Sequence, residues 1–399
     1  MSGNAFEEFA EAVALQTRKR EAGPARRFDR VTVLGGGSDA RLLAALCLAE
    51  GAEVRLFSAY GNELDALRAG GGVTIRGNGP IGTYQVDRQG IPSIATTGEL
   101  DKAVAGAELI FLTGPVHKQR TYAMVLADHV RDGQVLVLAP GRSLGAAEAA
   151  WLLRVGGCRA DYTIVEAQGL PFWITAAGNT LNLAETAPVA AATLPAGRHD
   201  VIAGLQRYMP NLLAVASTVH SGFADGSGLV EVPALLLGGP AVGDGAIAVP
   251  DGGTPLEENR SFRALIGERH EAVIARLADE RRKVASRFGV RDLPETGEWI
   301  AIHAGAARGG GRRAVPTPKQ AAAIVRCATI GSLAPLQSAA RVAGIAVPAT
   351  VAMIELASAV LGADIDSAGR KLESIGISSA EIDDARRILD DIAGGARHG

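Results

Sequence analysis

The sequence of 399 residues predicts an α/β fold in which a doubly wound parallel sheet is followed by a mostly α-helical second half. Short apolar runs alternate with helical patterns up to about residue 190, as in strands joined by crossover helices. From about residue 191, helical patterns follow one another between Gly, Pro and Asp clusters. We therefore predict an arm over 1–28, a sheet domain over 29–190 and a helical domain over 191–399.

The first strand and the turn after it form the most specific local motif. Residues 31–34 are apolar and mostly β-branched, which is typical of a buried parallel strand, and residues 41–50 have a helical pattern. The turn between them consists of Gly35, Gly36, Gly37, Ser38, Asp39 and Ala40.

This turn matches the dinucleotide-binding fingerprint of Rossmann domains, with Ala40 in its last small position. Gly35 allows the tight turn, and Gly37 lacks a Cβ, so that a pyrophosphate can approach the backbone. The free amides and the positive end of the helix dipole would bind the phosphates. With a second strand over 53–57, the turn predicts an N-terminal Rossmann domain that binds NAD or NADP; a purely structural glycine turn is the alternative.

The other elements of the first half follow from the same patterns. Helices are predicted where apolar residues recur at helical spacing, and strands where short apolar runs occur. The predicted helices are 63–68, 100–104, 118–129 and 144–155, and the predicted strands are 73–75, 82–86, 108–113, 134–138 and 162–165.

The second half is predicted to consist mainly of helices. Residues 342–362 are the most membrane-like segment, but Pro348 and Glu355 lie within it, so a buried helical hairpin is expected. Such a hairpin could pack in the core or form the interface of a homodimer. The predicted helices are 203–208, 262–288, 319–327, 333–343, 350–361 and 380–392.

Composition narrows the functional class. A net charge of −3 argues against nucleic-acid binding, since such proteins are usually basic. Cys47, Cys158 and Cys327 are far apart in the sequence, without the spacing of a metal site. We therefore expect reduced thiols and no bound metal. Acidic residues precede any apolar run at the N-terminus, which is unlike a signal peptide, and no membrane association is expected. These features predict a cytoplasmic enzyme.

Ligands of doubly wound sheets bind beyond the carboxyl ends of the strands. The second strand ends at Ser58, where NAD-binding domains usually carry Asp or Glu, so NADP is mildly favoured over NAD. Further cofactor contacts are predicted from the ends of later strands, at Thr113, Gly114, Pro115 and Pro140.

With this fingerprint and a helical second half, the chain resembles the opine dehydrogenase family of the octopine and nopaline type, over about residues 30–378. The order and spacing of six segments carry the resemblance. They are TGPVH at 113–117, VLVLAPGR at 135–142, VEAQGLPF at 165–172, GSLAPL at 331–336, RVAGI at 341–345 and GRKLESIG at 369–376.

The resemblance implies that NADH or NADPH reduces an imine formed from an amino acid and an α-keto acid, giving a secondary amine. The substrate would be a small amino-acid-derived molecule. Family members carry a catalytic histidine and an acidic pair at positions where this chain has Val232 and Cys327-Ala328. The resemblance therefore implies a divergent site whose proton donor comes from elsewhere.

Two residues are the main candidates for that donor. His220 lies twelve residues before Val232 and could reach the cleft, although an exposed loop histidine is equally compatible with the sequence. Glu231 could act as a carboxylic acid with a raised pKa. His303 precedes a glycine-rich stretch and could also enter the cleft.

Substrate contacts are predicted for Gln168, which follows a strand, and for Arg326, the nearest cation to the expected acidic pair. Arg142 could bind a phosphate or a carboxylate, or form a structural ion pair. A hydroxy-acid or alcohol dehydrogenase of the 6-phosphogluconate-dehydrogenase-like class is an alternative function, and would need a cleft lysine such as Lys118 or Lys319. A catalytically inactive dinucleotide-binding protein is the other alternative.

Overall fold

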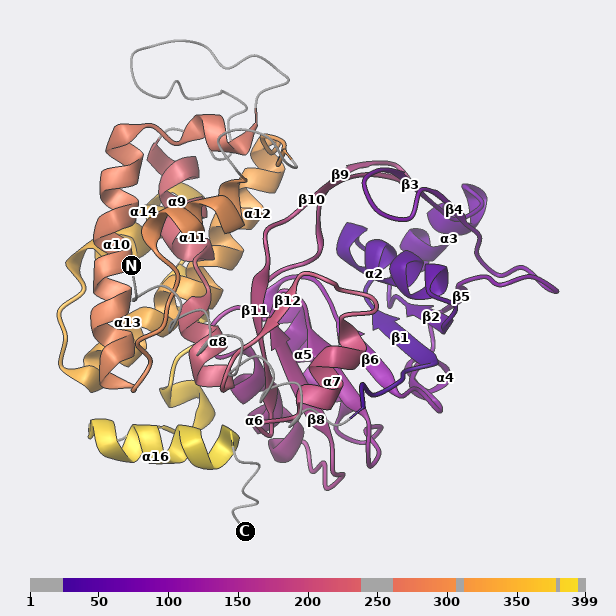
Figure 1. Cartoon of the computed structure of the whole chain (residues 1–399), viewed down its shortest axis with the longest axis horizontal. Helices are drawn as coiled ribbons and strands as arrows, with labels where there is room; N and C mark the ends of the chain where they lie inside the picture. Colours follow the sequence, from indigo (N-terminus) through magenta and orange to yellow (C-terminus); the bar gives the residue numbers. More distant parts are fainter. Residues whose placement is uncertain (1–23, 238–260, 306–311, 378–380, 394–399) are drawn as a thin grey trace, which may run out of the picture.

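The computed structural model describes residues 24–237, 261–305, 312–377 and 381–393, and most of the predicted arm therefore lies outside the described residues. A sheet domain and a helical domain lie side by side (Figure 1). This arrangement confirms the predicted fold class of an N-terminal Rossmann domain followed by a mostly α-helical domain.

The main sheet has eight strands in the order β12-β11-β8-β7-β6-β1-β2-β5. Every neighbouring pair is parallel except β8 with β11. The strands are β1 (Arg30–Leu34), β2 (Glu53–Phe57), β5 (Ala95–Thr97), β6 (Leu109–Leu112), β7 (Val135–Leu138), β8 (Thr163–Ala167), β11 (Val189–Leu194) and β12 (Leu212–Ala214).

Both faces of this sheet are buried, which explains its continuous apolar strands. Val33 and Phe111 belong to one apolar cluster, whereas Leu34 and Ile110, the adjacent residues, belong to the cluster on the opposite face. Helices α2 and α7 pack in the first cluster, and α4, α5 and α6 in the second. The helices of this domain are α2 (Ser38–Ala49), α3 (Gly61–Ala69), α4 (Leu100–Val104), α5 (Val116–Leu126), α6 (Gly145–Val155) and α7 (His199–Leu205).

The sheet extends beyond residue 190, where the sequence pattern placed the domain boundary. Strands β11 and β12 and the connecting helix α7 continue the main sheet as far as Ala214. The helical pattern near 203–208 thus belongs to the sheet domain. The boundary at 190 misses these strands because β11 contains three alanines, which strands disfavour, and β12 has only three residues, so neither gives a clear strand pattern.

A second sheet of four strands, in the order β4-β3-β10-β9, extends from the first domain. Strands β3 (Val73–Gly77) and β4 (Gly82–Tyr84) agree with the short strands predicted there. The hairpin of β9 (Phe172–Ala177) and β10 (Thr180–Glu185) had no clear pattern in the sequence. Figure 1 shows this hairpin running from the main sheet, beside the helical domain, towards β3.

The helical domain encloses its own apolar core, to which α9, α10, α11, α12 and α14 contribute. Among the described helices, none alone is long and apolar enough to cross a membrane; one pair, Pro348–Leu361 with Ile365–Ile375, meets these criteria jointly but is bent by 108°. The elements are α8 (Thr218–Ala224), α9 (Ser227–Leu237), η1 (Phe262–Leu265), α10 (Glu268–Arg287), α11 (Thr296–Ala304), α12 (Pro318–Ala328), the π-helical turn η2 (Thr329–Leu333), α13 (Ala334–Ala343), α14 (Pro348–Leu361), α15 (Ile365–Ala368), η3 (Glu373–Ile375) and α16 (Ile382–Ala393).

Candidate active site

A cavity of about 580 Å³ lies between the two domains. One side is formed by Ser38 and Asp39 of the fingerprint turn, together with β-strand ends of the sheet domain. The opposite side carries Glu231 from α9, His303 from α11 and Arg313. A cleft at the carboxyl ends of parallel strands is where ligands bind to this type of sheet.

The fingerprint turn has the geometry that a diphosphate group requires. Gly35 has φ +133°, and a Cβ at this position would lie 2.3 Å from Thr113 Oγ1, so only glycine fits. A Cβ at Gly37 would meet nothing within 4 Å, which leaves the approach to the backbone open. No side chain caps the N-terminus of α2 among the described residues, so its amides remain available for an anion.

The other predicted cofactor residues lie along the same edge of the sheet. Ser58 is buried at the end of β2. Thr113 follows β6, and its hydroxyl donates to Leu34 O at 2.8 Å. Gly114 and Pro115 lead directly into α5, and Pro140 lines the cavity beyond β7. That these residues contact the cofactor remains a prediction. The fold places them together at the carboxyl edge of the sheet, beside the fingerprint turn.

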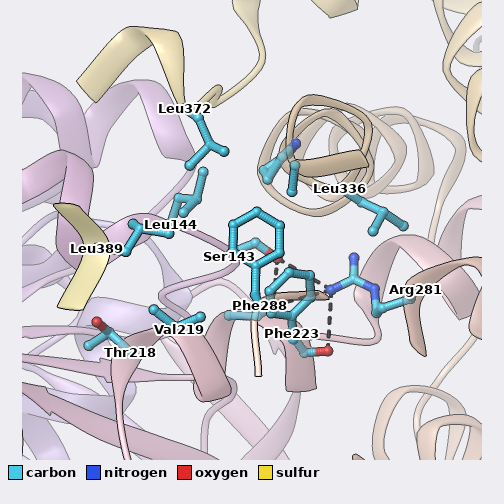
Figure 2. A pocket seen from close by; sticks show the side chains of 13 residues that line it. Ser143, Leu144, Thr218, Val219, Phe223, Arg281, Phe288, Leu336, Leu372 and Leu389 are labelled. Carbon is cyan, nitrogen blue, oxygen red and sulfur yellow. Dashed lines mark hydrogen bonds between the residues drawn. The ribbon is translucent and has the colours of Figure 1, made fainter. Parts of the chain in front are cut away.

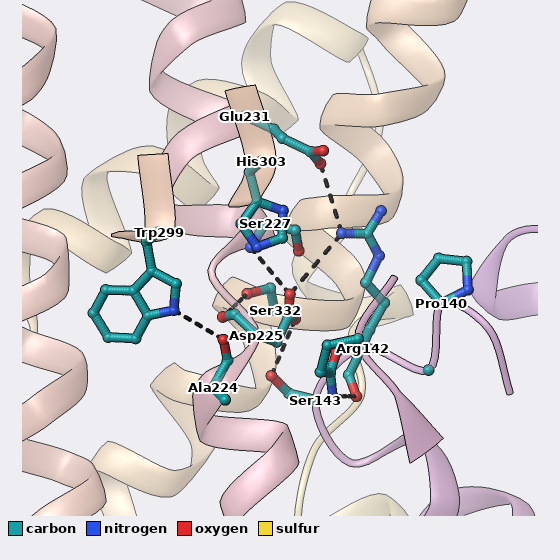
Figure 3. A network of polar contacts seen from close by, with 12 residues as sticks. Pro140, Arg142, Ser143, Ala224, Asp225, Ser227, Glu231, Trp299, His303 and Ser332 are labelled. Carbon is teal, nitrogen blue, oxygen red and sulfur yellow. Dashed lines mark hydrogen bonds and ion pairs between the residues drawn. The ribbon is translucent and has the colours of Figure 1, made fainter. Parts of the chain in front are cut away.

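Two arginines and a carboxylate form the charged centre of the cavity. Arg313 Nη1 lies 2.8 Å from Glu231 Oε1, and Arg142 Nη1 lies 3.6 Å from Glu231 Oε2. Figure 3 shows the Arg142 guanidinium directed between Glu231 and Asp225, with Asp225 Oδ1 4.0 Å from Nη1. Burial alone would raise the pKa of Glu231, but the Arg313 and Arg142 guanidinium groups hold it below its usual value. The prediction that Glu231 is a carboxylic acid with a raised pKa is therefore wrong, because the two guanidinium groups favour its ionised form.

His303 lies beside this charged centre and lines the cavity (Figure 3). Its side chain is buried, and Nε2 has no hydrogen-bond partner among the described residues. Burial lowers its pKa to about 4, although the nearby Glu231 and Asp225 oppose this shift. The free protein thus holds a neutral imidazole at the cavity wall, and its buried Nε2 has no hydrogen-bond partner among the described residues.

His303 provides a histidine close to carboxylates, although not at the positions that the family resemblance implied. Val232 and Ala328, which stand at those positions, are both fully buried in the apolar core of the helical domain. Adjacent helical residues are rotated by about 100°, so Glu231 reaches the cavity while Val232 faces the core.

Two predicted site residues lie apart from the described lining of the cavity. His220 is on α8, where its backbone amide donates to Ser217 Oγ at 3.3 Å. Arg326 is on α12, whose lining residues are instead Gln320, Ala323 and Ile324. Arg313, and not Arg326, is among the residues that line the cavity.

The proximity of His303 and Arg313 to a glycine-rich stretch was the sequence signal for the residues that do line the cavity. Such stretches often form loops beside a site, and these loops carry functional side chains. His303 was only a minor candidate on this basis, and Arg313 was not a candidate.

Gln168 lines the cavity as predicted and fixes the loop that carries Arg142. Its Nε2 donates to Arg142 O and to Glu166 Oε1, both at 3.1 Å, while its buried Oε1 has no partner within the described ranges. Burial raises the pKa of Glu166 to about 7, despite hydrogen bonds from Ser221 and Ala146. Arg142 has φ +61°, an uncommon conformation for a non-glycine residue.

A second cavity, shown in Figure 2, differs from the first in size and polarity. It has a volume of about 30 Å³, and its lining is almost entirely apolar. Arg281 at its edge donates to Gly222 O at 3.1 Å and to Ser332 Oγ at 2.8 Å. A space of this size holds little more than a water molecule, so it is a packing defect rather than a substrate site.

Comparisons with known proteins agree with the fold and the sequence resemblance. No family model matches the chain. The opine dehydrogenase of Arthrobacter sp. (strain 1C) is 24% identical over 360 residues, which cover 87% of this chain and 94% of that protein. The ocs protein of Agrobacterium tumefaciens (strain Ach5) is 24% identical over 378 residues, covering 91% and 99% of the two chains.

This chain is similar to opine dehydrogenases over most of its length. A solved structure of octopine dehydrogenase with NADH and pyruvate superimposes on this chain with a TM-score of 0.66, at 19% identity and over 92% of this chain and 98% of that one. Yersinopine dehydrogenase with bound NADP+ has a TM-score of 0.56 at 13% identity, over 94% of this chain and 100% of that one. The family resemblance inferred from the sequence is thereby confirmed.

Proposed function

We propose that this protein is an NAD(P)H-dependent oxidoreductase that reduces an imine, formed from an amino acid and an α-keto acid, to a secondary amine. One observation carries the proposal: a single cavity brings the diphosphate-binding turn together with His303 and the two guanidinium groups of Arg142 and Arg313. The similarity to opine dehydrogenases over most of the chain supports the same chemistry.

Arg142 and Arg313 would bind the substrate carboxylates. A guanidinium group binds a carboxylate through two parallel hydrogen bonds, which orient it as well as attract it. Arg313 is held in place by its contact with Glu231 and by stacking over Phe262, at 4.1 Å from the ring centroid. A carboxylate bound here would place the adjacent imine carbon in the cavity, on the side of Ser38 and Asp39.

When bound, the dinucleotide supplies the hydride. The reaction also consumes a proton, because an imine, a hydride and a proton together give the secondary amine. We assign the delivery of this proton to the imidazole of His303, which lines the cavity. Substrate carboxylates would neutralise Arg142 and Arg313, which both lower the His303 pKa, so substrate binding makes protonation of His303 easier.

The remaining wall of the cavity favours an amino acid with an apolar side chain. Trp173, Ile174, Ile302, Val315 and Ile324 contribute to this wall. The main carboxylate of the site, Glu231, is already paired with Arg313, so an extended cationic side chain would compete with that pair.

A hydroxy-acid dehydrogenase would need a lysine in the cleft. No lysine is among the described residues that line the cavity, and neither Lys118 nor Lys319 contributes to it. The imine-reducing function therefore agrees better with the geometry.

The test is oxidation of NADH and NADPH by the purified protein with pairs of amino acids and α-keto acids, followed by mass spectrometry of the products. We expect a secondary amine whose mass equals the two substrates minus one oxygen atom. Apolar amino acids should be the better substrates. Reduction of the keto acid alone to a hydroxy acid would support the alternative dehydrogenase, and cofactor binding without any product would indicate the inactive protein.

A further inference from the structure

A carboxylate lies directly against the fingerprint turn, although none was evident at the end of the second strand. Glu63 on α3 packs over Gly36, so closely that a Cβ at Gly36 would lie 1.9 Å from Glu63 Oε2. The hydroxyl of Ser58 donates to the same oxygen at 2.5 Å. Two elements of the dinucleotide-binding region thus hold one carboxylate in place.

The position of this carboxylate corresponds to the ribose side of the fingerprint. Strands β1 and β2 are parallel neighbours, with Leu34 paired to Phe57, so the residues that follow them lie next to each other. In Rossmann domains an acidic residue at the end of the second strand accepts hydrogen bonds from the ribose hydroxyls. Glu63 enters this position from the following helix, five residues after Ser58.

The charges around Glu63 leave its negative charge largely uncompensated. No lysine or arginine in the described part of the chain forms an ion pair with it. Arg41 lies near Gly36, but its Nε donates to Gly36 O at 3.0 Å and its Nη1 to Asn179 Oδ1 at 3.1 Å. Lys118 Nζ lies over the ring of Tyr60, 5.0 Å from its centroid. A 2′-phosphate brought to this position would meet a carboxylate before it met a free cation.

We propose that Glu63 makes the protein selective for NAD(H) over NADP(H), in contrast to the mild preference for NADP suggested by Ser58. Glu63 accepts hydrogen bonds from the two ribose hydroxyls and repels a 2′-phosphate. Ser58 acts as a positioning residue that orients the carboxylate. This inference rests on the dinucleotide-binding part of the proposed function and is independent of which imine is reduced.

The test is equilibrium binding of NADH and NADPH to the full-length protein without substrate. The fluorescence of the bound nucleotide gives each dissociation constant. We expect NADH to bind at least about tenfold more tightly than NADPH, which is the effect of a hydrogen bond to a charged group. Glu63→Gln should reduce this ratio by about tenfold, mainly by improving NADPH binding. Asp65→Asn is the matched control, because it removes an exposed carboxylate from the same helix, and its ratio should equal that of the wild type.

Two further measurements locate the effect and guard against misfolding. Adenosine 2′,5′-bisphosphate should gain affinity in Glu63→Gln, whereas 5′-AMP, which lacks the 2′-phosphate, should not. Ser58→Ala keeps the Glu63 carboxylate but removes the hydrogen bond that orients it. This variant should also lower the preference for NADH over NADPH, but by a smaller factor than Glu63→Gln.

Tighter binding of NADPH than NADH by the wild type would overturn the proposal. An unchanged ratio in a folded Glu63→Gln protein would do the same. Because no substrate is present, a protein that shows the expected nucleotide preference but reduces no imine would contradict the proposed reaction and leave this inference supported.

Discussion

Two buried arginine–carboxylate clusters flank the same loop over residues 140–143, but only one of them borders the large cavity. The closed cluster consists of Arg370, Glu148, Gln119 and Arg120. The open cluster consists of Arg142, Glu231, His303 and Arg313. Their contrast separates a network whose polar atoms are all paired from one that has unpaired atoms beside a cavity.

Every polar atom of Arg370 in the closed cluster has a partner. Its Nε donates to Glu148 Oε2 at 2.7 Å, Nη1 to Gly141 O at 2.6 Å and Nη2 to Gln119 Oε1 at 2.8 Å. Arg120 pairs with the other oxygen of Glu148 at 2.7 Å. A fully satisfied buried network of this kind connects residue 370 of the helical domain to the sheet domain and orders the loop.

In the open cluster, by contrast, several buried polar atoms lack a close partner. Glu231 Oε2 and His303 Nε2 are buried without hydrogen-bond partners among the described residues, and Arg142 reaches its carboxylates only at 3.6 and 4.0 Å. Unsatisfied buried polar groups are costly, and they require an explanation in a folded protein. Glu231 and His303 both line the cavity, so a small movement of either side chain would let a polar ligand supply the missing partner.

Breaking the closed cluster should have the largest effect, and it should act on stability. Arg370→Met leaves Glu148 Oε2 and Gln119 Oε1 without their buried partner, so we expect the free energy of unfolding to fall by about 3–5 kcal/mol. Urea denaturation measures this change. Arg341→Met, on an exposed position of α13, is the control and should alter stability by less than about 0.5 kcal/mol. Equal effects of the two variants would contradict the structural role.

Removing the imidazole of the open cluster should instead act on turnover. His303→Asn keeps a polar side chain but cannot transfer the proton, so kcat should fall by about a hundredfold or more, with little loss of stability. Steady-state kinetics and thermal unfolding measure the two effects. His220→Asn should retain wild-type kcat, since His220 does not belong to the described lining. The opposite result would restore His220 as the proton donor.

A smaller effect is expected from changing the carboxylate-binding geometry. Arg313→Lys keeps the charge but loses the planar pair of donors, so KM for the keto acid should rise by about tenfold, with a smaller change in kcat. Arg326→Lys is the matched control on α12 and should leave both constants unchanged. A rise in KM only for Arg326→Lys would place the substrate carboxylate outside the described cavity.

The smallest predicted effect is a pH dependence of stability due to His303. Its pKa of about 4 in the folded state lies below the ordinary value of 6.5, so between these pH values the unfolded chain binds a proton that the folded protein does not. The free energy of unfolding therefore has its full value, as far as His303 is concerned, above pH 6.5, and it decreases as the pH falls towards 4. We expect a loss of about 1 kcal/mol between pH 6 and pH 5 that His303→Asn lacks, measured by urea titrations at each pH. Parallel curves for both proteins would show that His303 is protonated or solvated in the folded state.

The sequence by itself determined the sheet domain and its dinucleotide-binding turn. All the residues of the strand, turn and helix lie between Arg30 and Ala49, so local backbone preferences and burial patterns suffice to predict them. The order of family-like segments extended this prediction to the helical half. The sequence did not predict β9 and β10, because they form an antiparallel pair with half-exposed faces. It did not predict β11 and β12 because β11 is rich in alanine, which strands disfavour, and β12 has only three residues.

Only the tertiary structure decided which side chains share the cavity. Arg142, Glu231, His303 and Arg313 come from distant parts of the chain, and their meeting depends on how α9 and α11 pack beside the sheet. The rotation of one residue along α9 sends Glu231 to the cavity and Val232 to the core. In the same way, Glu63 approaches Gly36 because of how α3 packs against the turn. Such contacts depend on the orientation of one element relative to another, which sequence spacing does not specify.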